Sequence, residues 1–231
     1  MPSLWSLLVR RWREWGWPER LQFALAVLLQ LALAGVLVSA LVETQWLVAF
    51  TAALVLAITF LPALIERELG LQLPVELTFV TCLFLYAAFG LGEVQEFYQR
   101  FWWWDLVLHS LSALILGLVG FLLVYSLHRT QRVVLPPAYF ALTAFGFAVT
   151  LGTLWEIFEY LMDWGFGFQM QKSGLDDTMT DLMVNGIGAL VASWVGYHYV
   201  KGGDSLLVDR LLRRMVARNP RFFRSRHGDS P

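Results

Sequence analysis

The sequence predicts an all-α polytopic membrane protein, a bundle of six transmembrane helices with both termini in the cytoplasm. Of its 231 residues, 58% are hydrophobic and only 15% are charged, and the mean hydropathy is +0.58. Soluble domains carry about 25% charged residues, so this balance is typical of a chain that faces lipid. Six apolar runs, each near the ~20 residues that span a hydrocarbon core, predict six helices.

Three regions follow from the positions of these runs. Residues 1–20 mix tryptophan with arginine and predict an interfacial amphipathic segment. This segment lacks a small-residue cleavage site, so the first span is expected to stay as an anchor. Residues 21–200 form the six-helix domain, and residues 201–231 form a basic cytoplasmic tail with one amphipathic helix. Both end regions are expected to contact anionic lipid headgroups.

Helix signals divide residues 21–200 into six elements. The expected spans are 21–42, 46–65, 74–92, 105–127, 136–163 and 177–200. Pro74 and Pro136 suit the first turn of a helix, because their missing N–H groups would have no partner there. Gly165 and Gly167 are expected to end the fifth span. The residues between Gly92 and Asp105 are polar and aromatic together, which is typical of a loop at a membrane interface.

The basic residues predict which side of the membrane holds the termini. With six spans, 15 of the 17 Lys and Arg lie on the side of the termini, and Arg100 and Lys172 lie on the other side. The positive-inside rule therefore predicts cytoplasmic termini. Ten of the 18 acids lie on or near the outer face. A single cysteine, Cys82, excludes an intrachain disulfide and a cysteine cluster for metal, and nucleic-acid binding has no support.

The acidic residues of the last two spans form two stripes. The stripe of the fifth span has spacing i, i+3, i+7 and that of the sixth has spacing i, i+4, i+8, so each lies on one helical face. The two sets are Glu156, Glu159, Asp163 and Asp177, Asp181, Asn185. Ionisable groups inside a bilayer are costly and turn toward a bundle interior or a wet cavity. Both faces are therefore expected to point away from lipid.

A third helix adds a histidine to the same layer. Asp105 and His109 begin the fourth span, which enters the membrane from the same side as the sixth. Small residues extend the three faces inward and allow close packing, namely Ser112, Gly152, Gly188 and Ala192. Neighbouring carboxylates cannot all stay ionised without a cation, so the set is expected to hold protons or a metal. Carboxylates with one imidazole suit hard or borderline divalent ions.

Plainer roles exist for some members. Asp105 and Asp177 could be helix N-caps, with Thr178 and Asp181 forming a capping-box-like pair, and Asp163 could mark the membrane boundary. Capping explains none of the deeper residues. A proton relay in a transporter uses the same residue types, but the chain shows no inverted repeat and no pair of broken half-helices.

These residues resemble two families of membrane proteins. The chain is similar to the YjdF-type bacterial inner-membrane proteins over residues 98–197. The similarity lies in Asp105 with His109, the run 155–160, Gln171, Asp177-Thr178 with Asp181, and Gly188-Ala189. It resembles VanZ-like proteins more distantly, through Asp105, His109, an acidic helix, and Asp181, Asn185 and Gly188. The arginine that VanZ-like proteins carry between the acidic helix and the final aspartate is absent, and Lys172 is the only nearby base. The resemblance implies a polytopic inner-membrane protein and names no reaction.

The hypothesis is an outward-facing intramembrane pocket that performs metal-dependent hydrolysis or group transfer on a lipid-linked or envelope substrate. The expected metal ligands are Asp105, His109, Glu156, Glu159, Asp177 and Asp181. The expected catalytic groups are Glu156, Glu159 and Asp181, and Asn185 and Gln171 would orient the substrate. The alternatives are a proton-coupled small-molecule transporter and a non-catalytic membrane scaffold.

Overall fold

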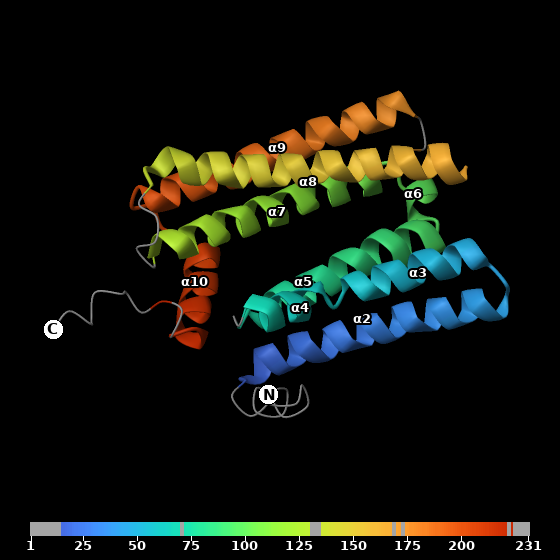
Figure 1. The fold of residues 1–231 in the computed structure, drawn as a ribbon, viewed down its shortest axis with the longest axis horizontal. Helices are drawn as coiled ribbons and strands as arrows, with labels where there is room; N and C mark the ends of the chain where they lie inside the picture. Colours follow the sequence, from blue (N-terminus) through green and yellow to red (C-terminus); the bar gives the residue numbers. More distant parts are fainter. Residues whose placement is uncertain are drawn as a thin grey trace. The chain divides into compact units, whose positions relative to one another are not determined.

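The structure is a computed structural model that describes residues 15–69, 72–129, 135–167, 170–171, 174–220 and 223. Within these ranges all regular secondary structure is helical (Figure 1). Five helical stretches are long and apolar enough to cross a membrane. They are Trp17–Val42, Trp46–Glu68, Val75–Val94, Trp104–Arg129 and Pro137–Phe166. The chain divides into two compact units, Met1–Phe97 and Tyr98–Pro231. Most of the predicted interfacial segment lies outside the described residues.

The first unit holds the first three predicted spans. Its elements are α2 (Trp17–Val42), α3 (Trp46–Ile58), α4 (Leu61–Leu69), α5 (Val75–Leu85) and the π-helix η1 (Tyr86–Val94). The predicted tight turn between α2 and α3 is present, and Thr44 adopts a positive φ of 57° in it. Pro74 precedes the first residue of α5, as expected from its missing N–H group.

The second predicted span is not one continuous helix. It is interrupted between α3 and α4, where Pro62 has no N–H group to continue the helical ladder. The Thr59 side chain at this break is buried, and its hydroxyl accepts a 3.0 Å hydrogen bond from Nε2 of Gln30. The polar residue that interrupts the first apolar run thus meets a polar residue of the second. Each satisfies the other away from water.

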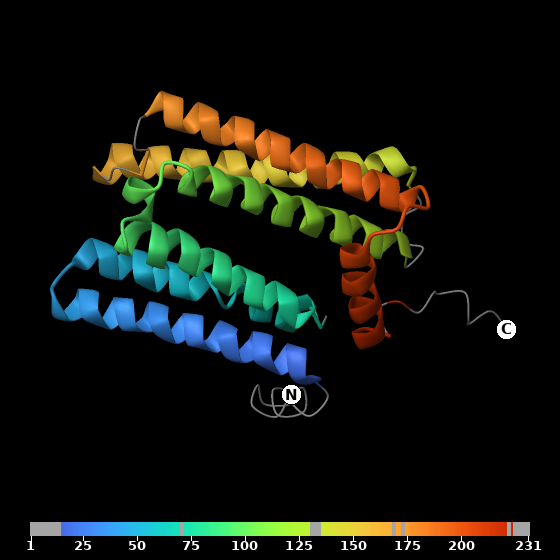
Figure 2. The same cartoon turned by 180° about the vertical axis from the view of Figure 1, so that it is seen from behind.

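The second unit holds three long helices that pack against one another. They are α7 (Trp104–Arg129), α8 (Pro137–Phe166) and α9 (Leu175–Val200), preceded by the single turn α6 (Phe97–Arg100), which begins at the last residue of the first unit. Figures 1 and 2, which view the chain from opposite sides, both show these three helices side by side. All three share extensive contacts with each other. This three-helix bundle carries every residue of the predicted site except Gln171, which lies in the connection between α8 and α9.

Small residues set the close approach of these helices, as predicted. A Cβ atom added to Gly117 of α7 would lie 2.5 Å from the Cβ of Ala192 on α9. A Cβ at Gly188 of α9 would lie 2.9 Å from the backbone oxygen of Ser110 on α7. Real Cβ atoms do not approach other atoms this closely, so the helices can pack at this distance only with glycine at these positions.

The α9 helix is the exception among the predicted spans, because its composition leaves it out of the five apolar stretches. It has the length of α7, 26 residues, but its first turns carry three aspartates. Its buried face is polar or small and consists of Asp181, Asn185, Gly188, Ala189 and Gly196. Its exposed large apolar side chains recur at helical spacing and are Met183, Ile187, Leu190, Val191 and Trp194. The polar residues of the buried face lower the mean hydropathy of α9. The structure therefore supports five spans by composition, and the sixth stays a prediction.

The boundaries of α8 differ from the prediction. The helix begins at Pro137, directly after Pro136, as expected, but it continues through Gly165 and ends at Phe166. Gly167 then adopts a left-handed conformation with φ of 69°, which glycine reaches without steric cost. The stop is therefore set by the second glycine alone.

The tail forms the predicted amphipathic helix, α10 (Leu206–Arg218). This helix packs against other helices of the protein. Its buried side chains are Val208, Leu211, Leu212 and Met215. Val208, Leu211 and Leu212 join one core cluster with Phe121 of α7 and Phe140 of α8. Figure 2 shows α10 crossing the end of the second unit's bundle. The apolar face of this helix is covered by other helices. The predicted contact with lipid headgroups would therefore use its basic face.

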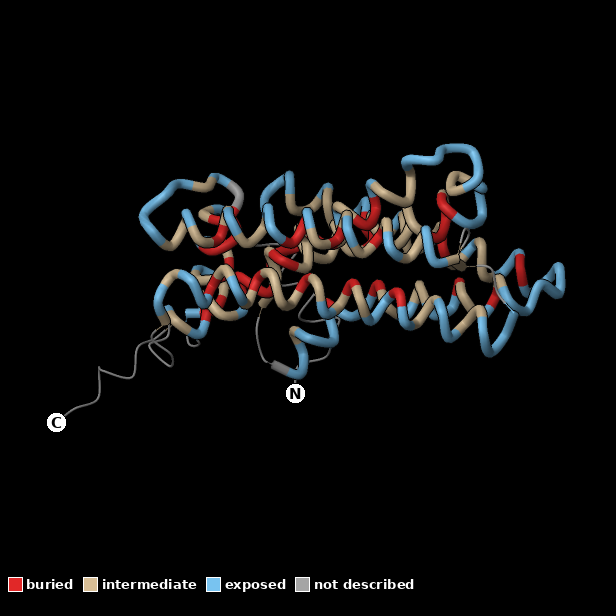
Figure 3. The backbone as a smooth tube through the Cα atoms, turned by 90° about the horizontal axis from the view of Figure 1, so that it is seen from above, coloured by how far each residue is buried: buried red, intermediate tan, exposed pale blue. Residues whose placement is uncertain are grey.

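Burial follows one face of each helix rather than whole segments. In Figure 3 buried and exposed positions alternate along the helical paths. Exposed large apolar side chains such as Leu31, Phe50 and Leu142 lie on the outer faces of α2, α3 and α8. Exposed apolar surface on this scale is typical of helices whose solvent is lipid.

Candidate functional site

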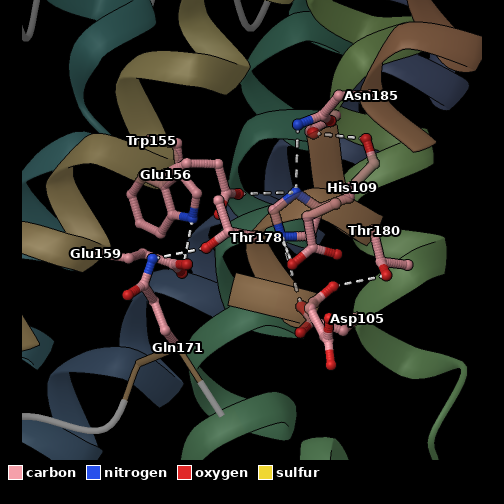
Figure 4. A network of polar contacts seen from close by, with 12 residues as sticks. Asp105, His109, Trp155, Glu156, Glu159, Gln171, Thr178, Thr180 and Asn185 are labelled. Carbon is pink, nitrogen blue, oxygen red and sulfur yellow. Dashed lines mark hydrogen bonds and ion pairs between the residues drawn. The ribbon is translucent and has the colours of Figure 1, made fainter. Parts of the chain in front are cut away.

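The site is built around the imidazole of His109, in the second turn of α7. This side chain is buried, and it has a carboxylate on each side (Figure 4). Its Nε2 atom lies 3.6 Å from Oδ1 of Asp105, one turn earlier on the same helix. The same Nε2 atom lies 3.7 Å from Oδ2 of Asp181 on α9. Asp105 and His109 of α7 therefore meet Asp181 of α9.

These three residues form a group that can hold a metal ion. One ligand atom from each of Asp105, His109 and Asp181 lies within 4.8 Å of the other two. Two carboxylate oxygens and one imidazole nitrogen are ligands for Zn²⁺, Mn²⁺ and related divalent ions. Metal bonds of about 2.0–2.2 Å would need only small movements of these side chains. The donor set and its spacing fit a divalent ion.

The opposite ring nitrogen faces α8 and the next turn of α9. Nδ1 of His109 lies 3.7 Å from Oε1 of Glu156 and 3.4 Å from Nδ2 of Asn185. Glu156 is only 3% exposed, and neither of its oxygens has a hydrogen-bond partner in the described part of the chain. The Thr178 hydroxyl lies beside this carboxyl, but no hydrogen bond of ordinary geometry joins the two groups. The Oδ1 atom of Asn185 is likewise buried without a partner.

Unpartnered buried oxygens of this kind are costly and mark a place where a proton or ligand is expected. An imidazole that binds a metal through Nε2 carries its proton on Nδ1. This N–H group commonly donates a hydrogen bond to a carboxylate. Glu156 occupies that position. The geometry therefore separates the predicted ligands into a group on Nε2 and a supporting carboxyl on Nδ1.

The remaining predicted residues lie around this centre in different roles. Oε1 of Glu159 accepts a 2.9 Å hydrogen bond from the indole of Trp155, and its side chain is only half-buried. Nε2 of Gln171 donates a 2.6 Å hydrogen bond to the Thr178 hydroxyl, which places the amide beside the acidic helix (Figure 4). No contact in the described residues joins Glu159 to the imidazole.

Asp163, the last acid of the α8 stripe, has a structural contact. Its two carboxylate oxygens accept hydrogen bonds from the backbone N–H groups of Met170 and Gln171, at 2.8 and 2.9 Å. These bonds tie the connection between α8 and α9 to the end of α8. The stripe thus divides by depth, with Glu156 at the imidazole and Asp163 in the connection.

The N-cap explanation of Asp105 and Asp177 is wrong. The α7 helix begins at Trp104, so Asp105 lies inside its first turn. The N-cap of α9 is Gly174, which has no side-chain cap, and Asp176 and Asp177 are both helical. Because the side chain of an N-cap precedes the first helical residue, neither aspartate fills that role. Favourable interaction with the helix dipole remains for all three.

A pocket opens beside the histidine group. It has a volume of about 320 Å³. Its lining residues come from α6, α7, α9 and the turn before α7, and they are Tyr98, Trp102, Asp105, Leu106, Asp176, Asp177, Thr180 and Asp181. Asp105 and Asp181 thus belong both to the metal-competent group and to the pocket wall. A molecule in the pocket would reach the two carboxylates directly.

Sequence reasoning missed five of these lining residues, Leu106 and two pairs. Tyr98 and Trp102 are spaced i, i+4 just before the fourth span, and were read only as part of an interfacial loop. Asp176 and Thr180 have the same spacing at the start of α9, where the Thr180 hydroxyl donates to the backbone oxygen of Asp176. Asp176 and Thr180 lie one helical turn apart on α9, whereas Tyr98 is in α6 and Trp102 is in the turn before α7. The i, i+4 spacing can be read from the sequence, but the chain path that brings the two pairs together cannot.

Comparison with known proteins places the chain in a family. A family model described as "Predicted membrane protein (DUF2238)" matches residues 24–202. The chain belongs to the DUF2238 family of membrane proteins. The match begins in the first span and ends just after α9, so it includes every residue of the His109 group. It covers both units, except for the N-terminal segment and α10.

A relative of this DUF2238 chain is a protein of Thermotoga maritima described as "Uncharacterized protein". The two are 28% identical over 145 residues, which is 62% of this chain and 73% of the relative. No solved structure matches the chain. The family match is consistent with the YjdF-type resemblance without naming it, and the VanZ-like resemblance stays a prediction.

Proposed function

We propose that this DUF2238 protein holds a divalent metal ion through Asp105, His109 and Asp181 and uses it for hydrolysis or group transfer on a lipid-linked or envelope substrate. The observation that carries the proposal is the arrangement around one buried imidazole. Two carboxylates meet its Nε2 atom, and an unpartnered buried carboxyl meets its Nδ1 atom. A bound divalent ion would supply a Lewis acid and an acidified water.

The chain's own residues have distinct parts in this proposal. Asp105 and Asp181 provide two of the negative charges that a divalent ion needs, and His109 provides a neutral nitrogen. With the ion bound, the Glu156 carboxylate would accept a hydrogen bond from Nδ1–H and hold the ring in the orientation that the ligand set requires. Asn185 also lies at Nδ1, with its Nδ2 atom 3.4 Å away, and restricts the ring from that position. Asp177 lines the pocket and receives a proton from a molecule bound there, and Gln171 orients the substrate through the Thr178 pair. The catalytic role of Glu159 stays a prediction.

The membrane position of the site rests on α9. We infer that α9 is a sixth span, because its exposed face is a continuous apolar stripe while its polar residues face α7 and α8. Six spans and the distribution of Lys and Arg put both termini in the cytoplasm of a bacterial inner membrane. His109, Asp105 and Asp181 then lie within the first two turns of helices that enter from outside, at most about 9 Å from the helix ends.

Metal content of the purified protein tests the proposal. Full-length protein in detergent, incubated with Mn²⁺, Zn²⁺ or Ca²⁺ and then freed of loose ions, should retain about one equivalent by elemental analysis, as a three-ligand site does. Asp181→Asn and His109→Gln should lose it. Asp204→Asn, which removes an exposed aspartate from the same unit, should retain it. Stoichiometric retention in the first two variants, or none in the wild type, would contradict the proposal.

One observation favours the proton-coupled transporter as a second candidate. Glu156, His109, Asp105 and Asp181 form a continuous series of protonatable groups with separations of 3.6 to 3.7 Å. Such a series can pass protons. The carrier predicts pH-driven uptake in vesicles that Glu156→Gln abolishes, with no metal bound at any pH. The metal site predicts the reverse pattern.

Topology has a separate test. A cysteine introduced for Arg226 in a Cys82→Ala background should react with a membrane-impermeant thiol reagent only after the cells are opened. Reaction in intact cells with a permeable outer layer would contradict the cytoplasmic terminus. It would also contradict the outward-facing position of the pocket.

A further inference from the structure

Thr178 of α9 lies on the same helical face as two residues of the candidate site. It precedes Asp181 by three positions and Asn185 by seven, and this spacing puts the three side chains on one stripe. Asp181 and Asn185 are buried and lie at the imidazole of His109. Thr178 is half-buried one turn nearer the start of the helix, where its hydroxyl lies beside the carboxyl of Glu156 on α8 (Figure 4). The site therefore includes a hydroxyl that the proposed ligand set leaves without a role.

The hydroxyl of Thr178 has a proton left to donate. Nε2 of Gln171 donates to this hydroxyl at 2.6 Å, so the bond occupies a lone pair of the oxygen and leaves its proton for another acceptor. The hydroxyls of Thr143 and Thr180 donate to the backbone oxygen four residues earlier in their helices. Among the described residues, Thr178 forms no bond of that kind, and the carboxyl acceptor beside it is that of Glu156.

The carboxyl of Glu156 lacks the donor that its burial calls for. Both of its oxygens are buried without a hydrogen-bond partner in the described part of the chain, and Oε1 lies 3.7 Å from Nδ1 of His109. The last torsion of a glutamate side chain is broad, so contact with the imidazole alone does not fix the plane of the carboxyl. A hydrogen bond from Thr178 would fix that plane and satisfy one of the buried oxygens. A small rotation of the two side chains would close this bond.

We propose that Thr178 is a positioning residue that holds Glu156 against the imidazole of His109. Its hydroxyl accepts a hydrogen bond from Gln171 and donates one to the Glu156 carboxyl, which accepts another from Nδ1–H. This series ties the connection between α8 and α9 to the ring that presents Nε2 to the metal. The metal part of the inference rests on the proposed function, whereas the contact between Thr178 and Glu156 requires no metal. Groups behind a ligating histidine change its metal affinity, so the role is measurable.

The Zn²⁺ affinity of Thr178 variants tests the positioning role. Full-length protein in detergent is titrated with Zn²⁺ in competition with a chelating dye. Thr178→Val keeps the shape of the side chain and removes the hydroxyl, so it should weaken Zn²⁺ binding by about three- to tenfold, the effect of losing one hydrogen bond. Thr178→Ser keeps the hydroxyl and should bind Zn²⁺ like the wild type. Thr143→Val is the matched control on α8, because its hydroxyl donates only to the backbone oxygen of Tyr139, and it should leave the affinity unchanged.

A double-mutant cycle shows whether Thr178 acts through Glu156. Glu156→Leu removes both carboxyl oxygens, so adding Thr178→Val to this variant should cause little further loss of Zn²⁺ affinity. Three results would overturn the positioning role. They are unchanged affinity in Thr178→Val, equal losses in Thr178→Val and Thr178→Ser, and losses in the double variant that equal the product of the two single losses.

Thermal unfolding of the same variants in a chelator separates this inference from the proposed function. Because the hydrogen bond requires no metal, Thr178→Val and Glu156→Leu should have non-additive effects on the melting temperature. Non-additive effects in a protein whose wild type retains no metal would support the contact and contradict the metal site. Additive effects on both melting temperature and affinity, in a protein whose wild type binds Zn²⁺, would support the metal site and overturn the positioning role.

Discussion

Oε1 of Glu156 lies 3.7 Å from Nδ1 of His109, and this carboxyl is buried on α8 without a hydrogen-bond partner. The pair joins α7 and α8 through two residues that are 47 positions apart in the chain. A carboxyl in this position fixes the tautomer and orientation of the ring, and through them the direction of Nε2. The contact makes Glu156 the residue whose replacement best separates a supporting role from direct ligation.

Glu156→Gln is expected to weaken metal binding by about 10- to 100-fold without abolishing it, the usual effect of losing a carboxylate behind a ligating histidine. Glutamine keeps the shape and removes the charge that favours Nδ1–H. Competition with a chelating dye measures the affinity. Loss as complete as in Asp181→Asn would make Glu156 a direct ligand, and unchanged affinity would remove it from the site.

Gly152→Ala should displace Asn185 from the imidazole. The added Cβ would lie 2.7 Å from Nδ2 of Asn185, a contact that requires movement of the side chain or of the helices. Overpacking of this kind costs about 1–3 kcal/mol. Gly146→Ala is the matched control on α8, because its Cβ would meet nothing within 4 Å, and it should be neutral or stabilising. Thermal unfolding in detergent compares the two, and equal melting temperatures would contradict the packing described.

Gly117→Ala tests the contact between α7 and α9 by rescue. The new Cβ would lie 2.5 Å from that of Ala192, so the single variant should unfold at lower temperature. Ala192→Gly removes the opposing methyl group and should restore much of the stability in the double variant. Because the two residues are in contact, their effects should be non-additive. Additive losses would show that the two helices do not meet at these residues.

Asp163→Ala should loosen the connection between α8 and α9 and leave metal binding intact. The variant loses two hydrogen bonds from the N–H groups of Met170 and Gln171 to a charged acceptor, and unfolding should become easier by about 1–3 kcal/mol. Hydrogen exchange of these two amides should accelerate. Metal loss comparable to that of His109→Gln would contradict the separation of Asp163 from the site.

Leu211→Ala tests whether α10 is part of the folded bundle. Leu211 is buried in the cluster that contains Phe121 and Phe140, and truncation of a buried leucine costs about 2–5 kcal/mol. Leu206 on the same helix is 91% exposed, so Leu206→Ala should change stability by less than about 0.5 kcal/mol. Equal stability of the two variants would mean that α10 is held by lipid instead.

Much of the fold could be predicted because apolar runs and helix signals act locally. The runs, Pro74, Pro136 and Gly167 indicated the helices within a few residues, and the alternation of polar and apolar faces indicated which side of α9 turns inward. The break at Thr59 was missed because the apolar run continues across it, although Pro62 is a local signal for such a break. The packing of α10 was missed because an amphipathic face looks the same whether lipid or protein covers it.

From the sequence alone one obtains an acid-rich membrane bundle and the set of residues from which a site can form, because spacing on a helix assigns side chains to faces. Their division into separate contacts depends on the tertiary structure. Only the packing of three helices through Gly117, Gly152 and Gly188 puts Asp105 and Asp181 at one nitrogen of His109 and Glu156 at the other. It likewise leaves Glu159 with Trp155 and Asp163 with the connection. Distances of a few ångströms between helices far apart in the chain decide these contacts, and local spacing carries no information about them.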